Sequence, residues 1–104
     1  MYFYTTYTQE AIEKIENYIE QSGYDYEDWH VGITNDIDNR LFFRHSVSRR
    51  GVWIYDELPT DSDARTVEDY FLDMGCQGGP GGGDWRSKFI YAYKITPYTI
   101  EQTW

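Results

Sequence analysis

Residues 29–45 read WHVGITNDIDNRLFFRH, and this stretch decides the fold that we expect. It opens with an apolar run, which predicts a strand over residues 29–34. The run ends in Thr-Asn-Asp at 34–36, whose side chains favour a turn and can cap a helix. A helix over residues 37–45 is one interpretation of the next segment, and the aromatic run at 41–43 leaves a strand as the other.

Helical and extended patterns alternate along the rest of the chain. Thr8 can cap the first helix, and Gly23 and Gly75 can end the first and the last. This alternation predicts an α+β or α/β layer of three or four strands covered by helices. The predicted elements are helices over 9–21 and 63–74, strands over 52–56 and 89–95, and a short optional strand at 2–4. The apolar helix positions expected in the core are Ile12, Ile15, Ile19, Ala64, Val67, Phe71 and Met74.

Length and composition predict a single domain over residues 1–104 with one modest core. The 11 Tyr, 5 Phe and 4 Trp supply large side chains to fill it. Cys76 is the only cysteine, which excludes an intramolecular disulfide and a cysteine-rich zinc site. No run approaches the roughly 18 apolar residues of a membrane span. We therefore expect a soluble, cytoplasmic protein without membrane partners.

The charge is strongly acidic, at −9 with a pI near 4.4, whereas a nucleic-acid binder is usually basic on at least one face. One segment departs from this balance. Residues 39–54 contain four arginines and no acidic residue. This basic block directly follows the predicted strand and turn, where a phosphate-binding face would be useful. The alternative is a solvated loop that balances its acidic neighbours.

Three residues in and beyond this block have side chains suited to phosphate chemistry. Arg40 falls eight residues after Gly32, and His45 falls five residues after Arg40. A guanidinium can hold a phosphate through its planar fork, and a histidine can act as a base near neutral pH. Glu68, in the helix predicted over 63–74, adds a carboxylate that could bind a metal ion.

This arrangement resembles the GIY-YIG nuclease superfamily, a small α/β fold with a mainly antiparallel sheet. In that family the first two strands carry tyrosine motifs, and a Thr-containing turn follows the second, YIG-like triplet. An Arg and often a His follow on the next helix, and a Glu on a later helix binds one divalent metal ion. The resemblance covers about residues 29–75. The matching positions are His30-Val31-Gly32, Thr34, Arg40, His45 and Glu68.

Three features depart from the family pattern. His30 stands where the second motif has a tyrosine, and no GIY triplet precedes it at hairpin distance. Tyr2 or Tyr4 would then have to supply the tyrosine of the first strand. The family's late Asn is also absent, and a glycine-rich segment over 78–84 stands in its place.

The resemblance implies metal-dependent hydrolysis of a phosphodiester in DNA or another nucleic acid. Glu68 would bind Mg²⁺ or Mn²⁺, and Arg40 would bind a non-bridging phosphate oxygen. His30 or Tyr4 would position or deprotonate the attacking water, with His45 close by.

Other interpretations remain open at this point. Arg40 could form a surface ion pair, His30 and His45 could be structural, and Glu68 could be exposed. The main alternative function is a catalytically degenerate domain that binds a protein partner, a DNA-mimicking inhibitor being a special case, because aromatic side chains are favoured at interfaces. A third is a housekeeping or phage-type domain without a separable activity. Convergence of the candidate residues on one concave site would favour the enzyme.

Overall fold

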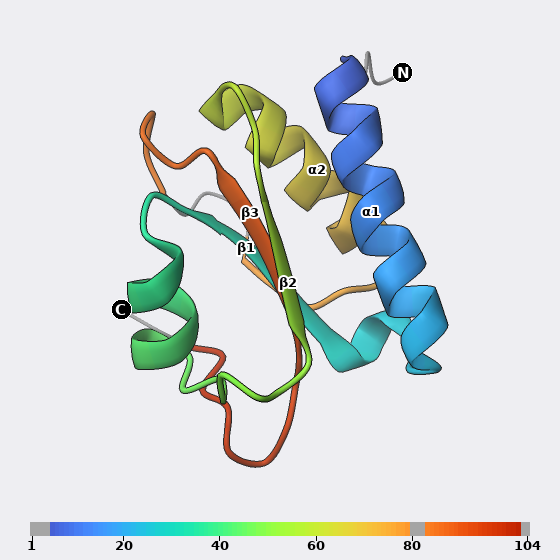
Figure 1. Cartoon of the computed structure of the whole chain (residues 1–104), viewed down its shortest axis with the longest axis vertical. Coiled ribbons are helices and arrows are strands. Elements are labelled where there is room, and N and C mark those ends of the chain that lie inside the picture. Colours follow the sequence, from blue (N-terminus) through green and yellow to red (C-terminus); the bar gives the residue numbers. More distant parts are fainter. Residues whose placement is uncertain (1–4, 80–82, 103–104) are drawn as a thin grey trace.

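A three-stranded antiparallel sheet forms the centre of the computed structural model, which describes residues 5–79 and 83–102 (Figure 1). The strands are β1 (Trp29–Thr34), β2 (Trp53–Glu57) and β3 (Phe89–Lys94). Their order is β1-β3-β2, so the last strand in sequence lies at the centre and pairs with both others. The α+β class, the antiparallel sheet and the adjacency of the three predicted strands are thus confirmed.

Two helices, α1 (Thr6–Ser22) and α2 (Asp61–Asp73), cover one face of this sheet (Figure 1). The Thr5 hydroxyl, not that of Thr8, caps α1 by accepting the Thr8 N–H at 3.0 Å. The predicted cap was therefore wrong by three residues. Gly23 ends α1 in the left-handed conformation, with φ of 82°, as expected.

Apolar side chains from both helices and from one face of the sheet form the main core. Met74 is an exception to the prediction, because it is 40% exposed. Helix α2 ends at Asp73, and Met74 caps it at the edge of the packed layer. The core includes Ala11, Ile12, Ile15, Ile19, Trp29, Val31, Ile33, Ala64, Val67, Phe71, Ile90 and Ala92.

The opposite face of the sheet is partly covered by η2, a π-helix over Asp38–Arg44 (Figure 1). The carbonyl of Asp36 accepts the Arg40 N–H at 3.0 Å and starts the helix. The His45 N–H then bonds to the Arg40 carbonyl, five residues back, at 2.9 Å, which is the wide turn of a π-helix. The helical interpretation of residues 37–45 is therefore correct, and the strand interpretation is wrong.

The face under η2 carries polar and aromatic side chains. His30 of β1 pairs with Tyr93 of β3, and Gly32 pairs with Tyr91. Because cross-strand partners point to the same side of a sheet, these residues share the face toward η2. Leu41 of η2 belongs to the same buried cluster as both tyrosines. Strand alternation thus separates an apolar face from a face with titratable groups.

The optional strand predicted at 2–4 lies outside the described residues, and α1 begins at Thr6. Within residues 5–79 and 83–102, no helix is long and apolar enough to cross a membrane.

Candidate functional site

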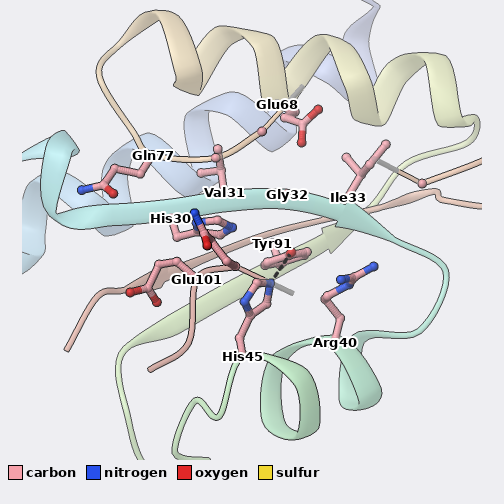
Figure 2. A pocket seen from close by; sticks show the side chains of 14 residues that line it. His30, Val31, Gly32, Ile33, Arg40, His45, Glu68, Gln77, Tyr91 and Glu101 are labelled. Atoms are coloured by element: carbon pink, nitrogen blue, oxygen red, sulfur yellow. Dashed lines mark hydrogen bonds between the residues drawn. The ribbon is translucent and has the colours of Figure 1, made fainter. Parts of the chain in front are cut away.

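A cleft of about 500 Å³ opens beside β1, the edge strand (Figure 2). Side chains of β1, η2, α2, β3 and the segment after β3 line it. Four candidate residues from the sequence are brought together here, and they are His30, Arg40, His45 and Glu68. In Figure 2, Glu68 lies above the β1 ribbon, and Arg40 and His45 lie below it.

Tyr91 is the tyrosine of the cleft, and the sequence analysis missed it. The proposed Tyr4 lies outside the described residues. Tyr91 belongs to β3, the strand that pairs with β1, and its ring lies beside Gly32. The alternation of residues 89–95 could have marked Tyr91, but only the β1–β3 pairing brings it to the cleft.

Gly32 has a specific steric role in this arrangement. A Cβ at this position would collide with the hydroxyl of Tyr91 and come within 2.7 Å of its Cζ atom. The absence of a side chain therefore lets the Tyr91 hydroxyl cross β1 into the cleft. Gly32 thus allows the Tyr91 ring to pack closely on β1 and its hydroxyl to reach the cleft.

His45, almost completely buried, is held at both ring nitrogens. Its Nδ1 lies 2.6 Å from the carbonyl oxygen of Ile100, and its Nε2 lies 2.8 Å from the Tyr91 hydroxyl. A carbonyl can only accept, so Nδ1 carries the proton and Nε2 accepts from Tyr91. Burial lowers the pKa of His45, which the contact with Ile100 opposes. The neutral tautomer is thus set to receive the phenolic proton.

His30, which is 8% exposed, packs against the same ring system. Its ring centroid lies 4.9 Å from that of His45 and 5.2 Å from that of Tyr93. Its Nδ1 is buried without a hydrogen-bond partner within the described residues. Burial, followed by His45 and Arg40, lowers its pKa to about 4. His30 is therefore neutral at pH 7 and retains an unused polar atom, a costly arrangement unless a ligand or water satisfies it.

Glu68 is only 2% exposed although it is a carboxylic acid. Burial, with the charge of Asp69, raises its pKa to about 7, and Arg65 opposes this. No salt bridge to its carboxylate occurs in the described parts of the chain. A buried carboxyl group without a salt bridge is suited to binding a metal ion or a proton.

By itself, Glu68 could hold a hard cation only weakly. Among the described residues, no group of three or more His, Cys, Asp or Glu side chains could hold a metal ion. An ion at Glu68 would therefore take the rest of its ligands from water and substrate. Mg²⁺ accepts such a set, since it often uses one or two carboxylates and phosphate oxygens.

Arg40 supplies positive charge to the cleft. Burial raises the pKa of Tyr91 above its usual range, and the Arg40 charge opposes that rise. The same charge lowers the pKa of both histidines. Arg40 is thus close enough to stabilise an anion formed near any of these groups.

The sequence matches no protein-family model, and no curated protein or solved structure is significantly similar to it. Function must therefore be argued from the cleft itself.

Proposed function

We propose that this chain is a divalent-metal-dependent, GIY-YIG-like nuclease that hydrolyses phosphodiester bonds in nucleic acid, DNA in the first instance. The observation that carries the proposal is the convergence of Arg40, His30, His45 and Glu68 with a tyrosine on one cleft. His30, Arg40 and His45 lie within one stretch of sequence, but only the fold brings Glu68 of α2 and Tyr91 of β3 to them.

Tyr91 and His45 form the proton-accepting pair in this proposal. His45 Nε2 takes the Tyr91 proton along the 2.8 Å contact, which leaves the phenolic oxygen able to take a proton from water. Tyr91 thereby assumes the role that the sequence analysis assigned to Tyr4. His30 packs against the His45 ring, with 4.9 Å between the ring centroids, and so helps to hold this pair in place.

Arg40 and Glu68 handle the phosphate and the metal ion. Arg40 binds a non-bridging oxygen and stabilises the charge that grows in the transition state. Glu68 would hold Mg²⁺ or Mn²⁺, which when bound polarises the phosphate and stabilises the leaving oxygen. Since the pKa of Glu68 is about 7, protons compete with the metal below that pH, and binding weakens in acid.

Removing Arg40 tests the enzyme directly. Purified protein is incubated with Mg²⁺ or Mn²⁺ and with single-stranded, duplex and branched DNA and RNA. Arg40→Ala should lower the rate by about 10²–10³, and Arg40→Lys should restore little, because the fork geometry is lost. Arg50→Ala, in an exposed turn of the same basic block, removes an equal charge and should cleave normally. If both alanine variants lost the same factor in cleavage rate, Arg40 would contribute only general positive charge and no specific phosphate contact.

Removing the Glu68 charge tests the metal site. Glu68→Gln should abolish Mn²⁺ binding measured with a non-cleavable nucleic-acid analogue present, since a single carboxylate binds weakly alone. Glu13→Gln changes an exposed carboxylate on α1, which does not act on Glu68, and should leave binding intact. Unchanged Mn²⁺ binding by Glu68→Gln would exclude Glu68 as the ligand.

The acidic surface favours a second candidate, a protein-binding module with an inactive nuclease fold. The outer side of α1 exposes Glu10, Glu13 and Glu20, and such a surface attracts basic partners. A DNA-mimicking inhibitor belongs to this class. Absence of cleavage on every substrate, together with salt-sensitive binding of a basic protein that Glu13→Lys weakens, would favour this candidate over the nuclease.

A further inference from the structure

The chain after β3 turns back and contacts His45 twice. The Ile100 N–H donates to the His45 carbonyl at 2.7 Å, and the Ile100 carbonyl accepts from His45 Nδ1. The next residue, Glu101, lines the cleft, and Figure 2 shows its side chain on the same side of β1 as His45. Residues 100–101 therefore belong to the site, although no sequence motif marks them.

A directional chain of hydrogen bonds runs from Tyr91 to Glu101. The hydroxyl of Tyr93 donates to Glu101 Oε2 at 2.9 Å, since an ionised carboxylate can only accept. The Tyr93 oxygen in turn lies 3.1 Å from His45 Nδ1, which carries the ring proton. His45 Nε2 accepts from Tyr91. The series thus leads from Tyr91 toward the carboxylate, with the His45 Nδ1 proton shared between the Tyr93 oxygen and the closer Ile100 carbonyl.

We propose that Glu101, acting through Tyr93, is a positioning residue that stabilises protonated His45 when His45 takes the proton of Tyr91. The inference rests on the proposed function for its catalytic meaning, but the interaction with His45 can be measured without cleavage. An acid that orients a catalytic histidine and stabilises its imidazolium is a known arrangement in other hydrolases. Here a tyrosine stands between the carboxylate and the histidine.

The proton balance of the step is simple. Water loses a proton to the Tyr91 oxygen as the Tyr91 proton moves to His45 Nε2, and the resulting hydroxide forms the new P–O bond. The scissile P–O bond breaks, and its electron pair leaves with the departing oxygen. The imidazolium then returns its proton to that oxygen through the cleft or to solvent. Glu101 exchanges no proton in this step and acts only through its charge.

Glu101 opposes other charges that face His45. Arg40 and Arg44, both on η2, disfavour a protonated His45, and Glu101 favours it. His30 faces the ring from β1 and is neutral near pH 7. The Glu101 carboxylate is thus the anion that offsets the two guanidinium groups around the imidazole.

Two substitutions remove this effect with little change in shape. Glu101→Gln removes the charge, and Tyr93→Phe removes the hydroxyl while keeping the buried ring. A matched pair elsewhere serves as control. Tyr70 donates to Glu16 at 2.6 Å between α2 and α1, on the other side of the sheet, so Tyr70→Phe and Glu16→Gln remove an equivalent contact away from the cleft.

The first readout is the protonation of His45, followed by ¹⁵N NMR of the imidazole during a pH titration of the whole protein. Glu101→Gln and Tyr93→Phe should each lower the pKa of His45 and shift its ring nitrogen signals, and the control variants should not. Glu101→Asp should move the titration back toward the wild type. An unchanged His45 titration in Glu101→Gln would overturn the inference, whether or not the protein cleaves nucleic acid.

The second readout is cleavage. Glu101→Gln should lower kcat about tenfold with KM unchanged, less than the 10²–10⁴-fold that a positioned base supplies. The acid limb of the pH–rate profile should move in parallel with the NMR titration. A wild-type protein that cleaves nothing would defeat the proposed function while the NMR result still decides the role of Glu101. Cleavage unaffected by Glu101→Gln would defeat that role alone.

Discussion

The two faces of the sheet carry alternate residues of the same strands, but one face is apolar and the other carries polar and aromatic side chains. Toward α1 and α2 lie apolar side chains such as Val31, Ile90 and Ala92. Toward η2 lie His30, Tyr91 and Tyr93, nearly as well buried. Burying polar groups is costly unless each is satisfied, and His30 Nδ1 is not. The apolar face therefore contributes more to stability than the polar face, whose His30 and Tyr91 line the cleft.

The largest expected effect lies on the apolar face. Phe71→Ala in α2 removes a completely buried ring, and we expect a loss of about 3–5 kcal/mol in the free energy of unfolding. Phe43→Ala, at a side chain of η2 that is 75% exposed, should change it by less than about 0.5 kcal/mol. Urea unfolding followed by circular dichroism measures both. Similar losses in the two variants would mean that the faces do not differ as described.

A smaller effect on the free energy of unfolding comes from two buried titratable groups that line the cleft, Glu68 and His30. Their contributions change with pH in opposite directions. The folded-state pKa of Glu68 is raised to about 7, so its neutral form is favoured and the free energy of unfolding falls as pH rises from about 4.5 to 7. The pKa of His30 is lowered to about 4, so the free energy of unfolding rises between about pH 4 and 6.5. Each contribution is about 3 kcal/mol, and they offset one another in the shared range.

Single substitutions should expose each contribution. Glu68→Gln keeps the histidine effect, so its stability should rise from pH 4 to 6.5, with His45 adding in the same direction because burial lowers its pKa as well. His30→Gln should instead lose stability as pH rises toward 7, by less than the Glu68 contribution alone because His45 still opposes it. Glu13→Gln, at an exposed site on α1, should follow the wild type. Denaturant midpoints measured across this pH range would contradict the argument if both cleft variants tracked the wild type.

The sequence was sufficient for the elements whose signals are local. Strand β1 was predicted with its observed bounds, because an apolar run and a turn signal delimit it. The predicted start of α1 was wrong because Thr5 and Thr8 both favour a cap. Thr8 is buried, with its hydroxyl 3.4 Å from Asp63 of α2, a tertiary contact that periodicity does not report.

The same distinction applies to the site. Arg40 and His45 could be predicted because a short stretch of sequence fixes their spacing from β1. Tyr91 and Glu101 could not, since they reach the cleft through the β1–β3 pairing and through the return of the chain after β3. Such contacts between distant segments leave no periodic trace in the sequence. Tyr4 was proposed because a tyrosine was required, and the strand beside β1 supplies one from the other end of the chain.

The smallest expected change in stability comes from a substitution at Gly32, the residue of β1 that packs against Tyr91. Gly32→Ala places a methyl group against the Tyr91 hydroxyl and Cζ atom, and overpacking of this kind costs about 1–3 kcal/mol. Gly79→Ala is the control, because a Cβ there meets nothing within 4 Å. The substitution should also separate Tyr91 from His45, so the ring nitrogen signals of His45 should shift and cleavage should be lost.

A double-mutant cycle identifies the partner in this collision. Tyr91→Ala removes the ring that the Gly32→Ala methyl group would strike. The second substitution should therefore cost less in the Tyr91→Ala background than in the wild type, a coupling within the roughly 0.5–3 kcal/mol seen for residues in contact. Additive losses would mean that the methyl group disturbs β1 itself. In that case Gly32 would be needed only for the conformation of β1, and it would have no part in placing Tyr91 against His45.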